Sequence, residues 1–211
     1  MRDIPQKIKE ELPFEGQFAI EELRSIGKHL RSHFNERELL EFESFSNDRR
    51  KREYTTSRLL LKNMALKWNE DKFIIKKDEL GQPYGLGNSR RYYVSIAHSR
   101  DKVFCGISPN QAVGVDLEPV AREVPARLRS RILHSEETEE LAKLETIRLW
   151  TIKEAFIKLR GQGLRLNMNE VQVRGENDRF FVEINNDKRA KICSFKSEND
   201  WLAIAHYQTK K

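Results

Sequence analysis

Short β-prone runs occur in two sets along the chain, and this arrangement limits the folds that it can adopt. The first set comprises residues 92–97, 102–107 and 112–117. The second set comprises residues 171–173, 180–184, 190–195 and 201–205. Turn residues separate the runs, which is typical of antiparallel strands. Apolar residues at helical spacing precede the two sets, at 49–68 and 146–160. The sequence therefore predicts an α+β fold.

The order of these segments also predicts how the chain is divided. Each half contains a helical stretch followed by strands, and residues 108–111 are the best candidate for a short link between the halves. We therefore expect an N-terminal half over residues 1–109 and a C-terminal half over residues 110–211.

Other stretches also have the composition or spacing of helices. One is the series Ile20, Leu23, Ile26 and Leu30. A second stretch follows Asn35, and a heavily charged one spans residues 122–145. We expect all three to be helical.

Charged residues make up 34% of the 211 residues and are mixed in sign, with 39 Lys and Arg against 33 Asp and Glu. A mixture of this kind indicates a solvated globular surface and not a disordered polyelectrolyte. The net charge of +6 favours an anionic partner. Composition alone leaves three kinds open: a nucleic acid, a phosphorylated small molecule and an acidic protein.

We expect neither a membrane span nor a secretory signal in this sequence. No apolar run is long enough to cross a bilayer, and the N-terminus lacks the apolar core of a signal peptide. Cys105 and Cys193 are far apart and have no metal-binding spacing, which is typical of a reducing compartment. We expect a cytoplasmic protein that has no membrane partner.

Two carboxylates lie close together in the sequence Gly-Val-Asp-Leu-Glu at 114–118. Residues two apart on a strand share a face, so Asp116 and Glu118 would lie side by side. A cation between them would relieve their repulsion, and Mg²⁺ prefers such hard oxygen ligands. An ordinary solvated strand end is the alternative, and this motif alone does not exclude it.

The segment at 150–158 reads Trp-Thr-Ile-Lys-Glu-Ala-Phe-Ile-Lys. It is predicted to form an amphipathic helix that carries candidate functional side chains on one face. Trp150, Glu154 and Lys158 follow one another at intervals of four residues, so they share one side. A Glu and a Lys at this spacing often form a simple surface pair. The neighbouring tryptophan favours a functional face, because such a ring is rarely left wholly in water.

The step Ala97-His98-Ser99 follows a β-prone run. A histidine at this position is most often structural, but a charged ring and neighbouring hydroxyls also suit a phosphate. No nucleophile-elbow motif or triad order accompanies it, so we discount a hydrolase.

Together these segments resemble the 4'-phosphopantetheinyl transferase superfamily. Its Gly-hydrophobic-Asp-hydrophobic-Glu strand is matched at 114–118, and its Trp-x-x-Lys-Glu-Ala/Ser-x-x-Lys helix at 150–158. Residues 97–99 match its Ser/Ala-His-Ser step, and residues 131–137 resemble its Arg-Phe-Phe-Ser-x-x-Glu stretch. The turn at 81–83 corresponds to its Gly-Lys/Arg-Pro turn. The chain departs from this pattern at Gln82, where the family has a basic residue, and at Ile132-Leu133, where it has two phenylalanines.

The length of the chain resembles the larger, surfactin-synthetase-activating type of this superfamily. That type implies two similar α+β halves packed as an internal pseudo-dimer, with one active site between them, in a monomer. The activity implied is transfer of the 4'-phosphopantetheine arm of coenzyme A to a serine of an apo acyl or peptidyl carrier protein, which releases 3',5'-ADP. The implied cofactor is Mg²⁺, and coenzyme A is the co-substrate.

The resemblance also implies roles for individual residues. The implied Mg²⁺ ligands are Asp116, Glu118 and Glu154. Glu154 and Lys158 would be catalytic, and Glu137 would assist. The implied coenzyme A contacts are Arg50, Arg52, Arg58, Gly81, Gln82, Pro83, His98, Ser99 and Lys158.

Two alternatives come from other classes of protein. A basic nucleic-acid-binding module would use residues 49–58 as a phosphate-contacting helix, but the sequence has no aromatic platform or known nucleic-acid motif, and we expect no nucleic-acid partner. A catalytically inactive coenzyme A- or carrier-binding protein would keep the fold without the reaction. The presence of every acidic residue of the motifs argues against that alternative.

Overall fold

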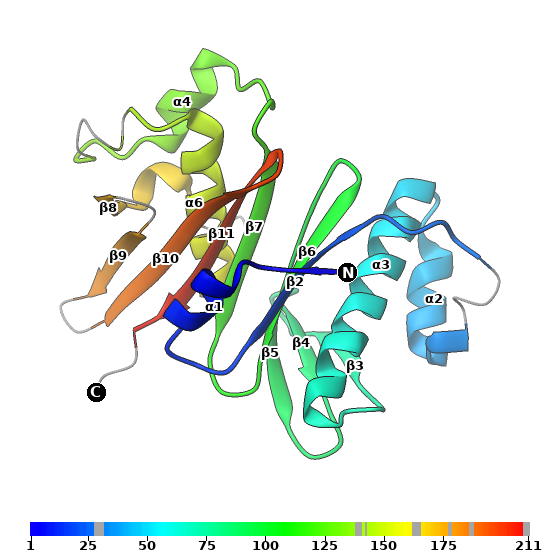
Figure 1. Cartoon of the computed structure of the whole chain (residues 1–211). Helices are drawn as coiled ribbons and strands as arrows, with labels where there is room; N and C mark the ends of the chain where they lie inside the picture. Colours follow the sequence, from blue (N-terminus) through cyan, green and yellow to red (C-terminus); the bar gives the residue numbers. More distant parts are fainter. Residues whose placement is uncertain are drawn as a thin grey trace.

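The computed structural model describes residues 1–27, 32–137, 141, 143–161, 166–176, 179–185 and 188–208. Its strands form two antiparallel sheets that have helices packed against them (Figure 1). The α+β class predicted from the sequence is confirmed. No helix in these ranges is both long and apolar enough to cross a membrane.

The first sheet has the strand order β1-β2-β6-β5-β4-β3. Its strands are β1 (Arg2–Asp3), β2 (Gln17–Glu22), β3 (Ile74–Lys77), β4 (Pro83–Leu86), β5 (Arg91–Ser99) and β6 (Lys102–Ser108). The second sheet has the order β7-β11-β10-β9-β8. Its strands are β7 (Val113–Pro119), β8 (Arg174–Glu176), β9 (Arg179–Asn185), β10 (Lys188–Ser197) and β11 (Asp200–Tyr207). In both sheets the strand that precedes the long helix pairs with the last strand of its set, so the two sheets share one topology. This repeat agrees with the two similar halves that were expected; the division at residue 109 itself stays a prediction.

The helices that the structure describes differ widely in length. They are α1 (Gln6–Glu11), α2 (Glu36–Ser44), α3 (Asp48–Ala65), α4 (Ala126–Ile132) and α6 (Thr146–Arg160), with single 3-10 turns η2 (Leu66–Trp68) and η4 (Met168–Glu170). α3 begins where the Asn47 side chain accepts a hydrogen bond from the Arg50 N–H, as expected of an N-cap. α6 ends at Gly161, whose φ of 68° lies in the left-handed region that glycine tolerates best.

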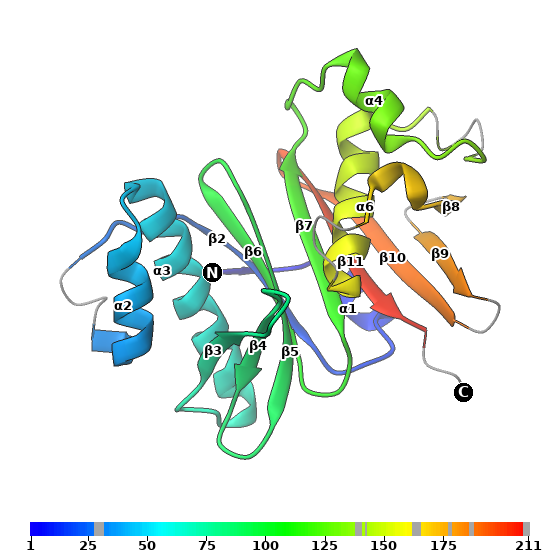
Figure 2. The same cartoon turned by 180° about the vertical axis from the view of Figure 1, so that it is seen from behind.

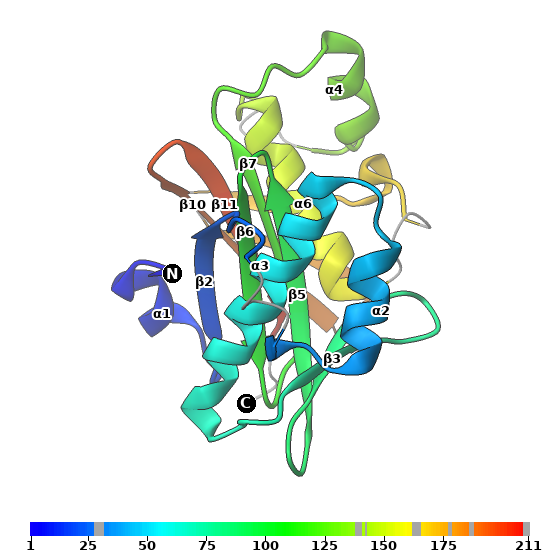
Figure 3. The same ribbon diagram turned by 90° about the vertical axis from the view of Figure 1, so that its right-hand side faces the viewer.

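Three of the four apolar clusters among the described residues hold the sheets and the long helices in layers. α3 packs on the first sheet through Leu60, Leu61 and Met64 (Figure 3), and α6 packs on the second through Ile152 and Phe156 (Figure 2). The third core joins the two sheets. It includes Phe18, Phe104, Val115, Leu117 and Leu202. The sheets are therefore held face to face between the two long helices.

Three sequence-based expectations about elements were wrong. Residues 112–117 do not continue the meander of β5 and β6, because β7 is buried along its whole length and pairs with β11 in the second sheet. The series from Ile20 is not a helix, because residues 17–22 form β2 between β1 and β6; Leu30 lies outside the described residues. The expected helix over 122–145 was wrong in its extent: the described residues there form α4, over seven residues, and a helical Leu141, while residues 138–140 and 142 lie outside the described residues.

Candidate active site

Asp116 and Glu118 lie on β7 and are 6% and 9% exposed. They are paired across the ladder with Ala203 and Trp201 of β11. Their spacing of two residues puts both carboxylates on one face of the strand, as the sequence predicts. Two acidic side chains buried side by side are costly unless a positive charge accompanies them.

Gly114 allows α6 to approach β7 closely. A Cβ atom at Gly114 would lie 2.0 Å from the carbonyl oxygen of Ala155 and 2.5 Å from the backbone nitrogen of Leu159. Both of these atoms belong to the backbone of α6, so a side chain at Gly114 would force the helix away. This contact brings Glu154 and Lys158, which lie next to those residues along α6, to the acidic strand.

Lys158 is the nearest cation to Asp116. Its Nζ lies 2.7 Å from Asp116 Oδ1, while Asp116 Oδ2 is buried and has no hydrogen-bond partner among the described residues. Burial raises the pKa of Asp116 to about 7, against the lowering effect of Lys158, and the charges of Glu154 and Glu118 raise it further. Asp116 thus combines a raised pKa with one buried oxygen that has no hydrogen-bond partner among the described residues.

Glu154 and Glu118 complete the acidic cluster. Burial raises the pKa of Glu154; Lys158 opposes this effect, and the charge of Glu118 adds to it. Glu118 accepts a hydrogen bond of 3.2 Å from Ser99 Oγ and forms an ion pair with Arg122. The charge of Glu118 therefore raises the pKa of both Asp116 and Glu154.

The donor set of this cluster fits a hard divalent cation in its chemistry. It offers carboxylate oxygens, which Mg²⁺ prefers, and the unbonded Asp116 Oδ2 is a buried acceptor in need of a partner. No three His, Cys, Asp or Glu side chains in the described ranges are gathered tightly enough to hold a metal ion. In this arrangement Lys158 and Arg122 supply the positive charge to Asp116 and Glu118.

A cavity of about 1070 Å³ opens beside the cluster. One wall comes from the β3–β4 turn and β5, and it includes Gly81, Gln82, Pro83, Val94, Ser95 and Ile96. The other comes from α4, α6 and η4, and it includes Leu128, Arg131, Ile132, Trp150, Glu154, Ile157, Lys158 and Met168. The two sheets are bridged at this level, where the Val115 N–H donates to Ser95 Oγ at 2.9 Å. The cavity thus lies between the two similar halves of the fold.

A second, smaller cavity of about 170 Å³ adjoins the first, because Pro83 and Ile96 line both. Arg50, Arg58 and His98 also line it. Arg50 Nη1 lies 3.0 Å from His98 Nε2. Desolvation lowers the pKa of His98, and the positive charges of Arg50 and Lys158 act in the same direction, against Glu53. The structure therefore brings these three predicted residues to one place.

The turn at Gly81-Gln82-Pro83 reaches across to α6. Gly81 has a φ of 83°, and the Gln82 side chain donates a 3.3 Å hydrogen bond to the carbonyl oxygen of Lys158. A Cβ atom at Gly161 would lie 2.1 Å from Gln82 Oε1. Gln82 therefore contacts the end of the helix that carries Lys158.

Two predicted residues lie elsewhere. Arg52 donates to the carbonyl oxygens of Leu23 and Arg24 and lines a different cavity. Glu137 forms a buried ion pair of 2.7 Å with Lys153 and accepts hydrogen bonds from the backbone N–H groups of His134 and Val173. The contacts of Glu137 are thus structural.

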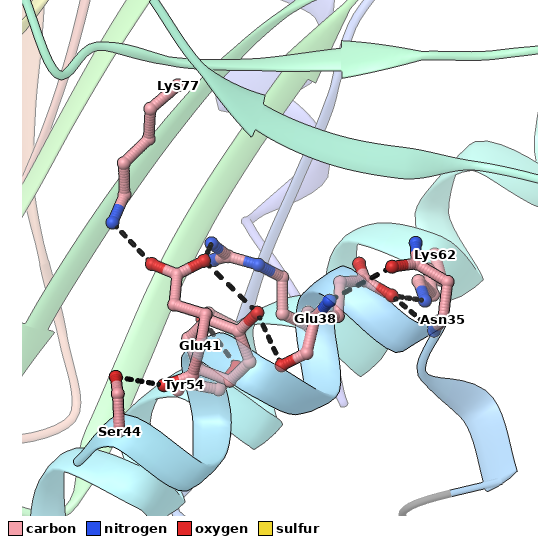
Figure 4. Close-up of polar contacts among 9 residues, drawn as sticks. Asn35, Glu38, Glu41, Ser44, Tyr54, Lys62 and Lys77 are labelled. Carbon is pink, nitrogen blue, oxygen red and sulfur yellow. Dashed lines mark hydrogen bonds and ion pairs between the residues drawn. The ribbon is translucent and has the colours of Figure 1, made fainter.

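Sequence reasoning missed three charged residues of the smaller cavity, Lys77, Glu41 and Glu53. None of them belongs to a motif. Lys77 pairs with Pro83 across the β3–β4 ladder, so a hairpin prediction centred on the turn at 81–83 would have brought it to the site. No signal in the sequence pointed to Glu41, whose Oε1 lies 2.6 Å from Lys77 Nζ (Figure 4).

Comparison with known proteins gives one family match and several similar relatives. Residues 112–208 match the family model of the 4'-phosphopantetheinyl transferase superfamily. The 4'-phosphopantetheinyl transferase gsp of Aneurinibacillus migulanus is 25% identical over 135 residues, which cover 61% of this chain and 54% of that protein. The 4'-phosphopantetheinyl transferase Sfp of Bacillus subtilis strain 168 is 32% identical over 92 residues, 41% of each chain.

These matches confirm the resemblance to the superfamily, whose family model matches residues 112–208. The matched segment contains β7 and α6, and hence Asp116, Glu118, Glu154 and Lys158. The matches span about half the length of the two relatives. The smaller cavity comes from residues that precede the matched segment.

Proposed function

We propose that this protein is a 4'-phosphopantetheinyl transferase that moves the phosphopantetheine arm of coenzyme A to a serine of an apo carrier protein and releases 3',5'-ADP. The observation that carries the proposal is the convergence of Asp116, Glu118, Glu154 and Lys158 beside a cavity between the two halves. Two similar halves, 1–109 and 110–211, would supply its opposite walls, which supports a monomer as the working unit.

The reaction requires a neutral hydroxyl to attack a negatively charged pyrophosphate. Bound Mg²⁺, held by Asp116, Glu118 and Glu154, would offset the charge on the pyrophosphate oxygens. Lys158 is 30% exposed and lines the cavity, so its ammonium group can contact a phosphate there and stabilise the charge that develops in the transition state. Glu154, whose pKa is raised, is the candidate to accept the serine proton.

The cationic smaller cavity supports a nucleotide at the other end of the same cleft. Arg50, Arg58 and His98 are donors suited to phosphate oxygens. They line the smaller cavity, which shares Pro83 with the larger cavity that Lys158 lines. The surplus of positive charge over the whole chain would also attract an acidic carrier protein and would raise the association rate most at low salt. Cys105 and Cys193 form no disulfide among the described residues, which supports a cytoplasmic location.

The direct test combines the protein, coenzyme A, Mg²⁺ and a panel of apo carrier domains, and measures carrier masses. We expect one or more carriers to gain the mass of phosphopantetheine. Asp116→Ala should abolish the gain, whereas Glu123→Ala, at an exposed carboxylate near the end of β7, should not. A panel in which no carrier gains mass, or an active Asp116→Ala variant, would contradict the proposal. Mg²⁺ should also raise the melting temperature of the wild type but not of Asp116→Ala.

Lys158→Ala separates transition-state from ground-state binding. Because Lys158 is proposed to act on developing charge, we expect kcat to fall by about 100-fold with a much smaller change in the affinity for coenzyme A. Steady-state kinetics and calorimetric titration measure the two quantities. A loss of affinity at constant kcat would assign Lys158 to substrate binding instead.

A further inference from the structure

A separate cavity of about 380 Å³ lies between α1 and the second sheet. α1 covers the face of this sheet that is opposite to α6 (Figure 1 and Figure 2). Ile8 of α1 belongs to the core between the two sheets, whereas Ile152 of α6 packs on the other face. This α1 cavity is lined by residues 8–12, β9, β10 and β11, and among the described residues it shares none with the two cavities of the candidate active site. A ligand bound there would be separate from the catalytic machinery.

The register of three strands builds the floor of the α1 cavity. Lys191 of β10 lies directly opposite Phe181 of β9 on one side and His206 of β11 on the other. Residues that are directly opposite in neighbouring strands share a face of the sheet, and all three line the cavity. The register therefore places an ammonium group between an aromatic ring and an imidazole.

His206 is only 5% exposed, and one of its ring nitrogens is left for a ligand. Its Nδ1 lies 3.0 Å from the carbonyl oxygen of Tyr207 and 3.3 Å from Gln111 Nε2. Its Nε2 makes no hydrogen bond to a described residue. Burial lowers the pKa of His206, and the charge of Lys191 acts in the same direction, against the backbone contact with Tyr207. A negative charge beside Lys191 and His206 would relieve both groups.

The other charges that line the α1 cavity are already paired. Arg179 forms an ion pair with Glu11, which ties α1 to β9, and Arg189 forms one of 2.5 Å with Glu183. Lys191 is exposed and forms no ion pair with a described residue. The cavity therefore has one unpaired positive charge, which matches a ligand with a single negative charge.

The remaining walls of the α1 cavity are apolar. Ile8 and Leu12 lie on the side of α1, and Phe181 and Ile192 on the side of the sheet. A volume of about 380 Å³ lies within the range of small-molecule sites, which combine mostly apolar walls with a few polar groups that fix the orientation of the ligand. A ligand that fits these walls has a hydrocarbon tail.

We propose that the α1 cavity binds a small amphipathic monocarboxylate, of the class of medium-chain fatty acids. Its carboxyl group lies at Lys191 and His206, and its tail lies between α1 and Phe181. A carboxyl group suits both polar partners, because it pairs with the ammonium group and shares a proton with a ring nitrogen. This site is independent of the proposed transferase activity.

The first test is calorimetric titration of the full chain with octanoate, octanol, octylamine and acetate. Octanoate should bind with saturation and more tightly than octanol, because only octanoate pairs with Lys191. Octylamine lacks the negative charge and acetate lacks the tail, so neither should show saturable binding. Lys191→Met should bind octanoate about fivefold more weakly, as expected for loss of an exposed cation, and Lys191→Arg should retain the wild-type affinity within about twofold.

The matched control is Lys196→Met, because Lys196 is an exposed lysine of the same strand that does not line the α1 cavity. Its affinity for octanoate should equal that of the wild type. Equal affinity for octanol and octanoate, or wild-type affinity in Lys191→Met, would overturn the placement of a carboxylate at Lys191. The absence of saturable octanoate binding by the wild type would overturn the site.

A second measurement locates the ligand. Cys193 lies opposite Arg179 in the ladder and lines the α1 cavity, whereas Cys105 is fully buried. Labelling of Cys193 by N-ethylmaleimide, followed by mass spectrometry of peptides, should slow by about tenfold when octanoate is present at about ten times its Kd. Octanoate that binds without slowing this labelling would occupy another place, and the proposed site would be rejected.

Discussion

At the scale of single residues, Asp116 has the most unusual environment of the candidate site. It is buried, it is paired with Lys158 through one oxygen only, and its pKa is raised to about 7. An unfolded aspartate titrates at about 4. Between these values the folded protein retains a proton that the unfolded chain has lost. The contribution of Asp116 to stability is therefore present at low pH and is lost as the pH rises through 7.

Asp116→Asn removes this titration. We expect the free energy of unfolding of the wild type to fall more steeply than that of the variant between about pH 4 and about pH 7 in the absence of Mg²⁺. Urea denaturation followed by circular dichroism across this range measures both slopes. Equal slopes in the two proteins would show that Asp116 does not titrate in the folded state near neutral pH.

Some residues of the candidate site could be predicted from the sequence, whereas the contacts of others could not. The acidic cluster and its lysine lie in two motifs whose spacing, on a strand or on a helix, already fixes a shared face. The contacts of Arg52 could not be foreseen in this way. Its guanidinium group donates to the carbonyl oxygens of Leu23 and Arg24, in a segment far away along the chain that only the folded structure brings beside α3.

At the scale of elements, a buried ion pair ties together the segments that form one wall of the cavity. Lys153 of α6 is fully buried and lies 2.7 Å from Glu137. Its ammonium group also donates to the carbonyl oxygens of Ile132, at the end of α4, and Met168, in η4. Burial lowers the pKa of Lys153, and Glu137 opposes that effect. One side chain thus holds α4 and η4 to α6.

Lys153→Met breaks this tie and leaves the Glu137 carboxylate buried without its cation. An unpaired buried charge is costly, so we expect the free energy of unfolding to fall by about 3–5 kcal/mol. Lys153→Met combined with Glu137→Gln should recover part of the loss, because no charge then stays buried. Chemical denaturation of the three proteins measures the effect. A double variant no more stable than Lys153→Met would argue against an unpaired charge as the cause.

At the scale of the whole molecule, the helices and most strands follow from local patterns, whereas the pairing of the strands does not. The apolar spacing that predicts α3 and α6 is a property of each segment alone. The place of β7 beside β11 depends on partners far away along the chain, and periodicity carries no information about such partners. The same limit explains why the series from Ile20 suggests a helix: β2 is a strand because β1 and β6 flank it.

The shared core between the sheets predicts that the two halves unfold together. Phe104 of β6 is fully buried in that core, so Phe104→Ala should lower the free energy of unfolding by about 3–5 kcal/mol. In a Trp68→Phe background the remaining tryptophans, Trp150 and Trp201, report on the second half. Their fluorescence and the far-ultraviolet circular dichroism should still change in one coincident transition. A second-half signal that is unaffected by Phe104→Ala would show that the halves unfold independently.

The pairing of β7 with β11 has a consequence for biosynthesis. The strand that bears Asp116 and Glu118 leaves the ribosome well before residues 200–207, its ladder partner in the second sheet. The first sheet, in contrast, can close as soon as β6 has been made. During translation β7 therefore has no partner strand in the second sheet until β11 has emerged. The candidate catalytic centre can be assembled only after that point.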